Sequence, residues 1–488
     1  MSIAFVRPPG PFRLQRGNPA IRPLGLFSMM AVLRSIDIQA DLIDLYLPGR
    51  TERDVIDLAR RGDYRMFGIT CTTNVRFSAI SIANLLKTHF PERPIIAGGP
   101  HFSKCAEDAL KHVESIDIVV RGEGEGVIKE LVPALLNGDD WSRVKGISYR
   151  EGSRIRHNPD AEPVQDLDSL PIFTQFTHKD YPETLSMHRE NGKVLPAIAM
   201  ETSRGCPNRC LFCSATIQSY RVRSPVSVVD EMEMWMDLFP GVRAFNFMDL
   251  TFTADREHVT GLCEEILSRN LEVLWWGESR ADIDPDLLDI MYAAGCRALS
   301  VGVESGSPTV LAAIGKNISL EHVYRLARKC DSLGIWLDPF LMFSLPKETL
   351  DDVKMTLALI KRLLKEHKKV LYPGGGGTVT SIHPGSQLET IARRRGIIPQ
   401  DFSWHEPYYE PRNLDVFRSP YVPIYLDNLS RRDLVRAVWK SNHLIRVKYQ
   451  GRYARYKDLI RALFSPRESL GKKATKVWNH FQTLFRTF

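Results

Sequence analysis

The sequence predicts an α/β protein in which an N-terminal doubly wound parallel sheet precedes a partial (βα)6 barrel and a helical C-terminal region. Short apolar segments alternate with amphipathic helical patterns along residues 1–140, and the same alternation resumes along residues 195–390. The chain has 488 residues, which is too long for one ordinary core. We therefore expect domains at 1–140 and 195–390, a linker at 141–194 and a helical domain at 391–488.

Five strand–helix units account for the first domain. One of its helical patterns is Leu26, Met29, Met30 and Leu33, whose spacing is that of a buried helix face. Strands joined by helices pair in parallel, are covered on both faces, and bind ligands at their carboxyl ends. The expected strands are 3–6, 40–45, 66–71, 94–97 and 116–120.

Six further strand–helix units occupy the second domain. Six units are too few for a closed eightfold barrel, so we expect a partial, open barrel with its chemistry at the strand ends. The C-terminal domain is predicted from helical patterns at 434–439 and 456–464. The expected barrel strands are 197–202, 244–248, 273–276, 298–303, 337–343 and 379–382.

The composition is that of an ordinary globular protein, with 43% hydrophobic and 25% charged residues. A net charge of +7 is mild over this length. A solvated helical face explains it better than a site for nucleic acid, a membrane surface or an anionic substrate, and no nucleic-acid partner is expected. No apolar run approaches the ~18–20 residues that span a bilayer. We expect a cytoplasmic protein whose eight cysteines are thiols or metal ligands.

Three cysteines form a C-x3-C-x2-C motif directly after the first barrel strand: Cys206, Cys210 and Cys213. Three thiolates on one loop can each bind one iron of a cubane cluster and leave the fourth iron open. Structural zinc sites normally have four protein ligands, and no fourth Cys or His lies nearby. A zinc site or a chance cluster is therefore the weaker alternative.

This motif, in this position, resembles the radical SAM superfamily, whose members cleave S-adenosylmethionine (SAM) at a 4Fe-4S cluster. The resemblance implies that SAM chelates the open iron and that one electron releases a 5′-deoxyadenosyl radical. It also implies cofactor contacts at the aromatic residue before the third cysteine and at four charged strand-end residues, each of which has a surface salt bridge as its alternative role: Phe212, Asp249, Glu278, Arg280 and Glu304. The sequence departs from the family at Ser344 and Lys347, where glycine is frequent.

Glycine-rich turns follow the fourth and fifth strands of the first domain, as Gly98-Gly99-Pro100-His101 and Gly122-Glu123-Gly124. Ordinary tight turns are one explanation, and close approach to a ligand is another. Coupled to the barrel, the turns resemble those of the cobalamin-binding radical SAM enzymes. That resemblance implies that cobalamin is held by residues on three loops: Thr70, Thr72, Asn74, Gly98, Gly99, His101, Gly122, Glu123 and Gly124.

The D-x-H-x-x-G motif of methionine-synthase-type domains is absent, so no histidine is expected to ligate cobalt from below. Cys71 is more readily explained as a buried thiol than as a cobalt ligand. Some relatives of this architecture keep the first domain as a structural lobe, which is the alternative to cobalamin binding.

The leading hypothesis is a cobalamin-dependent radical SAM methyltransferase that methylates an unactivated carbon of a small molecule through methylcobalamin. By the same resemblance, an external donor such as flavodoxin or ferredoxin supplies electrons. A second hypothesis is a ring-forming, ring-cleaving or rearranging enzyme without methyl transfer, and a third is a cluster-bearing regulatory or electron-transfer module. The substrate is not identified; the C-terminal aromatic residues are candidates to cover it, and core packing explains them equally well: Trp404, Tyr408, Tyr409 and Trp439.

Overall fold

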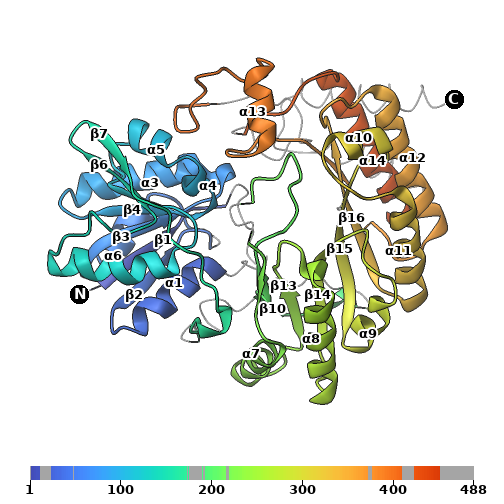
Figure 1. Cartoon of the computed structure of the whole chain (residues 1–488), viewed down its shortest axis with the longest axis horizontal. Coiled ribbons are helices and arrows are strands. Elements are labelled where there is room, and N and C mark those ends of the chain that lie inside the picture. Colours follow the sequence, from blue (N-terminus) through green and yellow to red (C-terminus); the bar gives the residue numbers. More distant parts are fainter. Residues whose placement is uncertain are drawn as a thin grey trace.

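A computed structural model of the chain places two parallel sheets side by side, each with its own helices (Figure 1). The structure describes residues 2–10, 23–47, 49–172, 174, 189–190, 193–215, 219–371, 376–408 and 422–450.

The first sheet has the strand order β2-β1-β3-β4-β5-β6-β7. Neighbours from β2 to β5 are parallel, which confirms the predicted parallel sheet, whereas β6 and β7 are antiparallel additions at the β5 edge. The strands are β1 (Ser2–Arg7), β2 (Gln39–Asp44), β3 (Tyr64–Thr70), β4 (Ile95–Gly98), β5 (Ile118–Val120), β6 (Ile147–Glu151) and β7 (Arg154–His157).

The hairpin β6–β7 comes from the range 141–194 that was predicted as a linker. Its single turn is made by Gly152 with φ +61°, and its polar outer strand is too short to give a clear alternation. The hairpin is fixed to the sheet by Arg150, whose guanidinium donates to the carbonyls of Leu110, Val113 and Ile116. The first sheet therefore extends beyond residue 140.

Helices cover both faces of this sheet. Along β1, Ala4 and Val6 face one core and Ile3 and Phe5 face the other, as the alternation of side chains in a strand requires. The first core is completed by α2, α3 and α5, and the second by α1 and α6. The helices are α1 (Leu24–Arg34), α2 (Asp54–Ala59), α3 (Arg76–His89), α4 (Gly99–Lys104), α5 (Ala106–His112) and α6 (Glu125–Asn137), with the 3-10 turn η1 at Thr73–Val75.

The second sheet has six strands in the order β10-β13-β14-β15-β16-β17, all parallel, which confirms the predicted open (βα)6 arrangement. Its outward side chains pack with the helices into one large core. The strands are β10 (Ala197–Met200), β13 (Ala244–Phe247), β14 (Leu274–Arg280), β15 (Cys296–Glu304), β16 (Trp336–Phe343) and β17 (Gly377–Val379).

The barrel helices are α7 (Pro225–Leu238), α8 (Arg256–Ser268), α9 (Leu287–Ala293), α10 (Pro308–Ala313), α11 (Leu320–Leu333) and α12 (Leu350–Glu366), followed by α13 (Gln387–Arg394). Most of them start at a residue whose side chain caps the first turn: Ser224, Asp255, Ser307, Ser319, Thr349 and Ser386. Short elements are β8 (Arg189–Glu190), β9 (Lys193–Val194), β11 (Ser203–Arg204), β12 (Arg221–Val222), η2 (Leu167–Ser169) and η3 (Phe252–Ala254).

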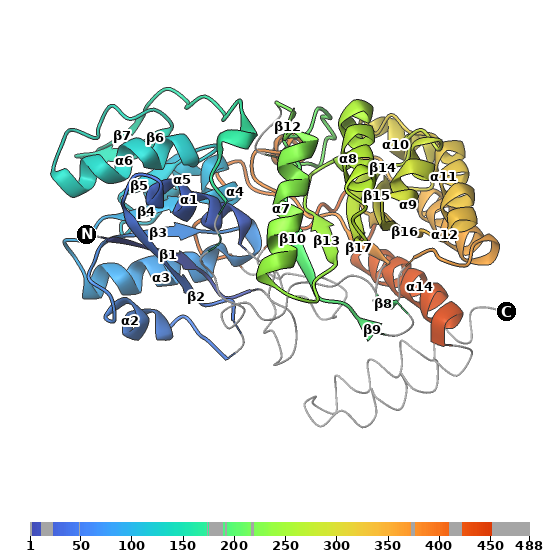
Figure 2. The same ribbon diagram turned by 90° about the horizontal axis from the view of Figure 1, so that it is seen from below.

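The described part of the C-terminal region packs into two small buried clusters that it shares with the barrel and the first domain. Its long helix α14 (Arg431–Gln450) contains the predicted pattern at 434–439 and packs on α12 and β17, beneath the barrel in Figure 2. The segment between α13 and residue 408 instead reaches the first domain, where Trp404 donates its backbone N–H to Asp108. The predicted helix at 456–464 and Tyr409 lie outside the described residues.

Candidate functional site

The cysteine motif forms a loop after β10, and its three thiols are unlike the other five. Cys206 and Cys210 are half-buried and Cys213 is exposed, whereas the remaining five cysteines are buried. The backbone N–H of Cys213 donates to the carbonyl of Cys210 at 3.0 Å, which closes the loop into a turn. Burial raises the pKa of the half-buried Cys210, and Glu304 and the neighbouring thiol of Cys206 add to the shift. The three thiols of the motif thus lie on one short loop and are more accessible than the other cysteines.

Within the described residues, no three His, Cys, Asp or Glu side chains are arranged to share one metal ion. A cubane cluster makes a different demand, because each thiolate binds a separate iron. The thiol of Cys206 lies 3.3 Å from the hydroxyl of Thr251 and 3.6 Å from the amide nitrogen of Asn208, both of which suit a thiolate. Three free thiols on one half-exposed loop thus fit a cluster with three protein ligands.

The base of this loop is held by Asp249, at the end of β13. Its carboxylate accepts hydrogen bonds from the backbone N–H and hydroxyl of Thr202, at 2.7 and 2.5 Å, and from the backbone N–H of Ser203 at 3.1 Å. Burial raises the pKa of Asp249 to about 6, and these hydrogen bonds oppose the shift. The residue predicted to contact SAM therefore orders the cysteine loop.

The other strand-end residues face the same loop. Burial raises the pKa of Cys210, and the cations of Lys316 and Arg280 oppose the shift, with Glu304 acting against them. Glu304 pairs with Lys316 at 3.0 Å, and both side chains are only 7% exposed. Burial raises the pKa of Glu278 to about 7, with further contributions from Asp249 and Glu304.

The sequence predicted Arg280 and Phe212 as site residues but not Lys316. Lys316 was missed, because a lone lysine after a short helix carries no pattern. Arg280 pairs with Asp282 at 2.9 Å, and Phe212, on the loop itself, packs half-buried against the barrel core. The backbone N–H of Leu211 donates to the carbonyl of Ile314 at 3.0 Å, so the turn before Lys316 is bonded to the cysteine loop.

The two departures from the family pattern keep the backbone shape that glycine would adopt. Ser344 and Lys347 have φ values of +68° and +65°. Ser344 is held there by Glu348, which accepts its N–H at 2.5 Å, and by the carbonyl of Tyr425, which accepts its hydroxyl at 2.5 Å. Lys347 is exposed. The turn after β16 is thus maintained with side chains that strain it.

The glycine-rich turns of the first domain meet at the carboxyl edge of its sheet. Thr70 and Gly98 are register partners on β3 and β4, and a Cβ on Gly99 would stand 2.3 Å from Thr70 Oγ1. Ser103 on α4 accepts the backbone N–H of Gly122 at 3.2 Å, which joins the second turn to the first. No atom lies within 4 Å of a Cβ built on Gly122, so that turn faces open space.

The remaining predicted contacts of this edge differ in exposure. Thr72 is exposed and Asn74 half-buried on the loop after β3, and Gly124 packs against Met29. Cys71 is buried, and burial raises the pKa of its thiol, as expected for an inert cysteine.

His101 is buried under the C-terminal segment. Its Nδ1 lies 3.2 Å from Thr73 Oγ1, and its ring centroid is 5.1 Å from that of His405. His405 in turn bonds Asp108 at 2.7 Å through Nδ1. Among the described residues, the Nε2 atoms of both histidines and Nη2 of the buried Arg76 have no hydrogen-bond partner. Unpartnered buried polar atoms beside open glycine turns fit a polar ligand such as the amide-fringed corrin.

Glu123, another predicted cofactor contact, is fully engaged within the protein. Arg221, just after the cysteine loop, donates to both of its carboxylate oxygens, at 2.6 and 3.0 Å, and Val164 donates its N–H at 2.7 Å. Burial raises the pKa of Glu123, but these bonds and the charge of Arg204 outweigh it, and the pKa is lowered overall. The arginines were missed because nothing local marks their partners.

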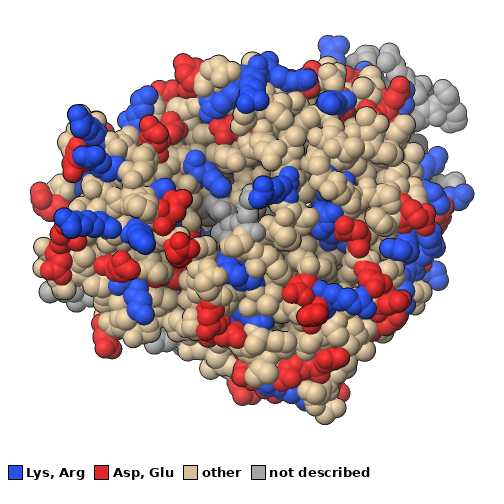
Figure 3. Space-filling view, in the orientation of Figure 1, with Lys and Arg blue, Asp and Glu red and all other residues tan. Residues whose placement is uncertain are grey.

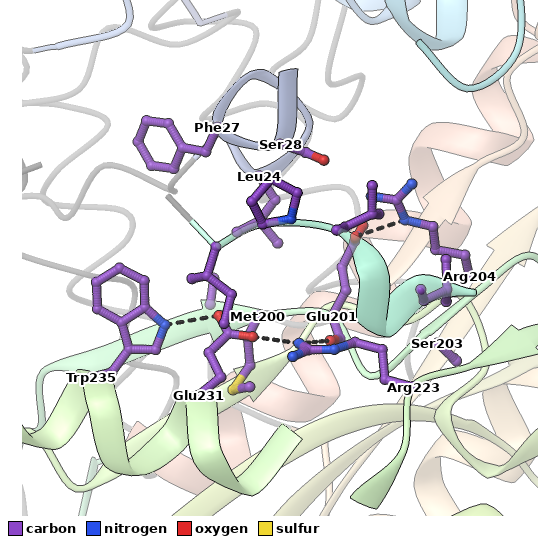
Figure 4. Close-up of a pocket in the computed structure, with 15 residues that line it drawn as sticks. Leu24, Phe27, Ser28, Met200, Glu201, Ser203, Arg204, Arg223, Glu231 and Trp235 are labelled. Atoms are coloured by element: carbon purple, nitrogen blue, oxygen red, sulfur yellow. Dashed lines mark hydrogen bonds and ion pairs between the residues drawn. The ribbon is translucent and has the colours of Figure 1, made fainter. Parts of the chain in front are cut away.

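A hollow that opens to solvent lies between α1 and the edge strand β10 (Figure 4). Phe27 and Trp235 line its apolar wall, and two other lining residues, Glu201 and Arg204, pair with each other at 3.2 Å. Burial raises the pKa of Glu201, and Arg204 opposes the shift. The hollow thus reaches the root of the cysteine loop.

Acidic and basic side chains are interspersed over the face shown in Figure 3, and several Lys or Arg residues border the central depression where the domains meet. Every helix among the described residues is too short or too polar to cross a membrane.

Residues 200–360 match the model of the radical SAM superfamily, and residues 18–132 match that of the B12 binding domain. The chain belongs to the cobalamin-binding radical SAM enzymes. This enzyme is 28% identical to an uncharacterised methyltransferase of Pyrococcus horikoshii over 80% of this chain and 82% of that relative. It is 27% identical to the anaerobic magnesium-protoporphyrin IX monomethyl ester cyclase of Synechocystis, over 70% and 69% of the two chains.

Two solved structures share the fold of this radical SAM enzyme. The methyltransferase TsrM from Kitasatospora setae, with cobalamin and a 4Fe-4S cluster bound, superposes with a TM-score of 0.65 at 20% identity, covering 81% of this chain and 78% of TsrM. OxsB, with aqua-cobalamin and SAM bound, gives 0.69 at 18% identity, covering 99% and 70%. Both superpose on most of this chain, in agreement with the predicted fold.

Proposed function

We propose that this protein is a cobalamin-dependent radical SAM methyltransferase that methylates an unactivated carbon of a small molecule. One observation carries the proposal. The barrel carries three free thiols on one loop, the first domain carries a sheet edge lined by glycines, and ion pairs such as Glu123–Arg221 connect the two domains directly. The relatives include a cobalamin-dependent radical SAM methyltransferase of Streptomyces tokunonensis and a 2-(S-pantetheinyl)-carbapenam-3-carboxylate methyltransferase of Streptantibioticus cattleyicolor.

The cofactors are a 4Fe-4S cluster, SAM and cobalamin. The thiolates of Cys206, Cys210 and Cys213 would hold three irons, and the turns at 98–101 and 122–124 would hold the corrin. When bound, the reduced cluster supplies the electron that cleaves SAM, and the cobalt carries the methyl group.

The protein contributes charge at the strand ends. Lys316 lies close enough to Cys210 to favour its thiolate, and Glu304 keeps the lysine in place at 3.0 Å. Glu278, with a pKa near 7, is available to bind the SAM ammonium and gains full charge when the cation arrives. Asp249 keeps the cysteine loop in position through Thr202 and Ser203.

A ring-forming reaction without methyl transfer is the second candidate. It is favoured by the similarity to anaerobic cyclases from three bacteria, at 27–31% identity. The enzymatic relatives over both matched regions leave the non-enzymatic electron-transfer module without support.

Anaerobic purification with cobalamin supplied, followed by reaction with SAM and a reductant, tests the proposal. We expect iron and cobalt in the protein, and both S-adenosylhomocysteine and 5′-deoxyadenosine as products. Formation of 5′-deoxyadenosine with no S-adenosylhomocysteine, in cobalamin-loaded protein, would reject methyl transfer in favour of the second candidate. If S-adenosylhomocysteine does form, a gain of one CH2 unit in a substrate would identify the methylated product.

We also propose that an external carrier such as flavodoxin or ferredoxin reduces the cluster. A cytoplasmic location is inferred from the eight free cysteines, since thiols persist in reducing compartments.

A further inference from the structure

The cysteine loop begins and ends in a two-stranded ribbon. Its strands, β11 and β12, are antiparallel, with Ser203 opposite Val222 and Arg204 opposite Arg221. The loop leaves this ribbon through Gly205, where φ is +86° and a Cβ would stand 2.1 Å from the carbonyl of Ser219. The ribbon therefore fixes where the loop starts and ends.

Arg204 and Arg221 are like charges directly opposite each other, an arrangement that is unfavourable by itself. Neither is left to solvent: their side chains are 13% and 8% exposed. Buried guanidinium groups need carboxylate partners. Those partners come largely from the other domain.

Glu123 and Glu125 supply them from the turn after β5. Glu123 binds Arg221 through two hydrogen bonds, and its oxygen lies 3.8 Å from Arg204. Glu125 binds Arg204 at 2.8 Å and is oriented by the hydroxyl of Ser28, which donates to it at 2.6 Å. Both carboxylates are 5% exposed or less.

The turn that carries these carboxylates is also bonded to the other glycine-rich turn, at the sheet edge proposed to hold the corrin. Gly122 is bonded to Ser103 on α4, and Glu123 and Glu125 follow within three residues. A displacement of the glycine turn would therefore move both arginines and, with them, the two ends of the cysteine loop. These contacts therefore couple the position of the cysteine loop to that of the first domain.

We propose that Glu123 and Glu125 are positioning residues that set the placement of the cysteine loop against the cobalamin domain. This inference rests on the proposed function and gives Glu123 a different role from the cofactor contact expected from its motif. Methyl and hydrogen transfer at one substrate require both cofactors at fixed relative positions. The two carboxylates supply that constraint without touching either cofactor.

The test compares Glu123→Gln and Glu125→Gln, singly and together, with Asp284→Asn, which breaks the exposed Arg256–Asp284 pair. Glutamine keeps the shape of each side chain and removes its charge. In the apo-protein, hydrogen exchange of residues 202–215 should accelerate by about tenfold or more in the double variant and stay unchanged in Asp284→Asn.

The holoenzyme supplies the second readout. Iron, cobalt and reductive SAM cleavage should persist in the glutamine variants, while the magnetic coupling between cob(II)alamin and the reduced cluster, seen by electron paramagnetic resonance, should change. Loss of cobalt with unchanged loop exchange would overturn the proposal, because it would place the carboxylates on the corrin. Absence of S-adenosylhomocysteine in the unmodified protein would reject the methyltransferase function instead, and the exchange result would still decide the positioning role.

Discussion

Replacing Gly99 with alanine should destabilise the first domain and damage its proposed cobalamin site. Gly99 begins α4 with φ +86°, a conformation that costs an L-residue about 1–2 kcal/mol. The new Cβ would stand 2.3 Å from Thr70 Oγ1 and 3.4 Å from the backbone of Cys71. Overpacking of this kind costs about 1–3 kcal/mol. We therefore expect Gly99→Ala to lose about 2–5 kcal/mol.

Thermal unfolding of the apo-protein, followed by circular dichroism, measures this loss. One kcal/mol corresponds to about 2–4 °C for a cooperative unit of 150–250 residues, so the midpoint should fall by about 4–20 °C. Cobalt per chain, after purification with cobalamin supplied, should fall as well, because Gly99 lies on the sheet edge proposed to hold the corrin.

Thr70 provides the matched control. Thr70→Ala removes the atom that the new Cβ would strike, whereas Thr70→Val keeps a branched side chain in its place. In combination with Gly99→Ala, the alanine should recover the steric part of the loss, about 1–3 kcal/mol, and the valine should recover none of it. Equal effects of Gly99→Ala in both backgrounds would refute the steric reasoning.

Alanine at all three cysteines of the motif should abolish bound iron and SAM cleavage. The control variant Cys263→Ala, at a thiol buried in the barrel core, should retain iron. Iron retained by the triple variant would contradict the ligand assignment. Binding of SAM to cluster-loaded protein should strengthen as pH rises through about 7, because only the ionised carboxylate of Glu278 attracts the ammonium group. Calorimetry should show this dependence flattened in Glu278→Gln, and an unaltered profile would remove Glu278 from the SAM site. Lys347→Gly should raise the free energy of unfolding in urea by about 0.5–1 kcal/mol, since glycine relieves the positive φ at an exposed position; a loss of stability would show that the lysine side chain compensates its own strain.

Both sheets could be predicted because their signal is local. Apolar strand segments separated by amphipathic helices occur at regular intervals, and strands such as β1 expose alternate side chains to two cores. The hairpin β6–β7 lay outside this signal, because two short polar strands at a sheet edge show little periodicity. The C-terminal region shows the same limit: its helix α14 was predicted, but its attachment to α12 was not.

The spacing of Cys206, Cys210 and Cys213 determined by itself that three thiols share one loop, since so few residues separate them. The glycine-rich segments likewise indicated where tight turns follow β4 and β5, and Gly99 and Gly122 do adopt positive φ there. Only the tertiary structure decided which groups complete the site. Glu123 and Arg221 are 98 residues apart, and Asp108 and His405 are 297 apart. Partners at such separations are selected by the path of the whole chain, and the periodicity of a local segment carries no information about that path.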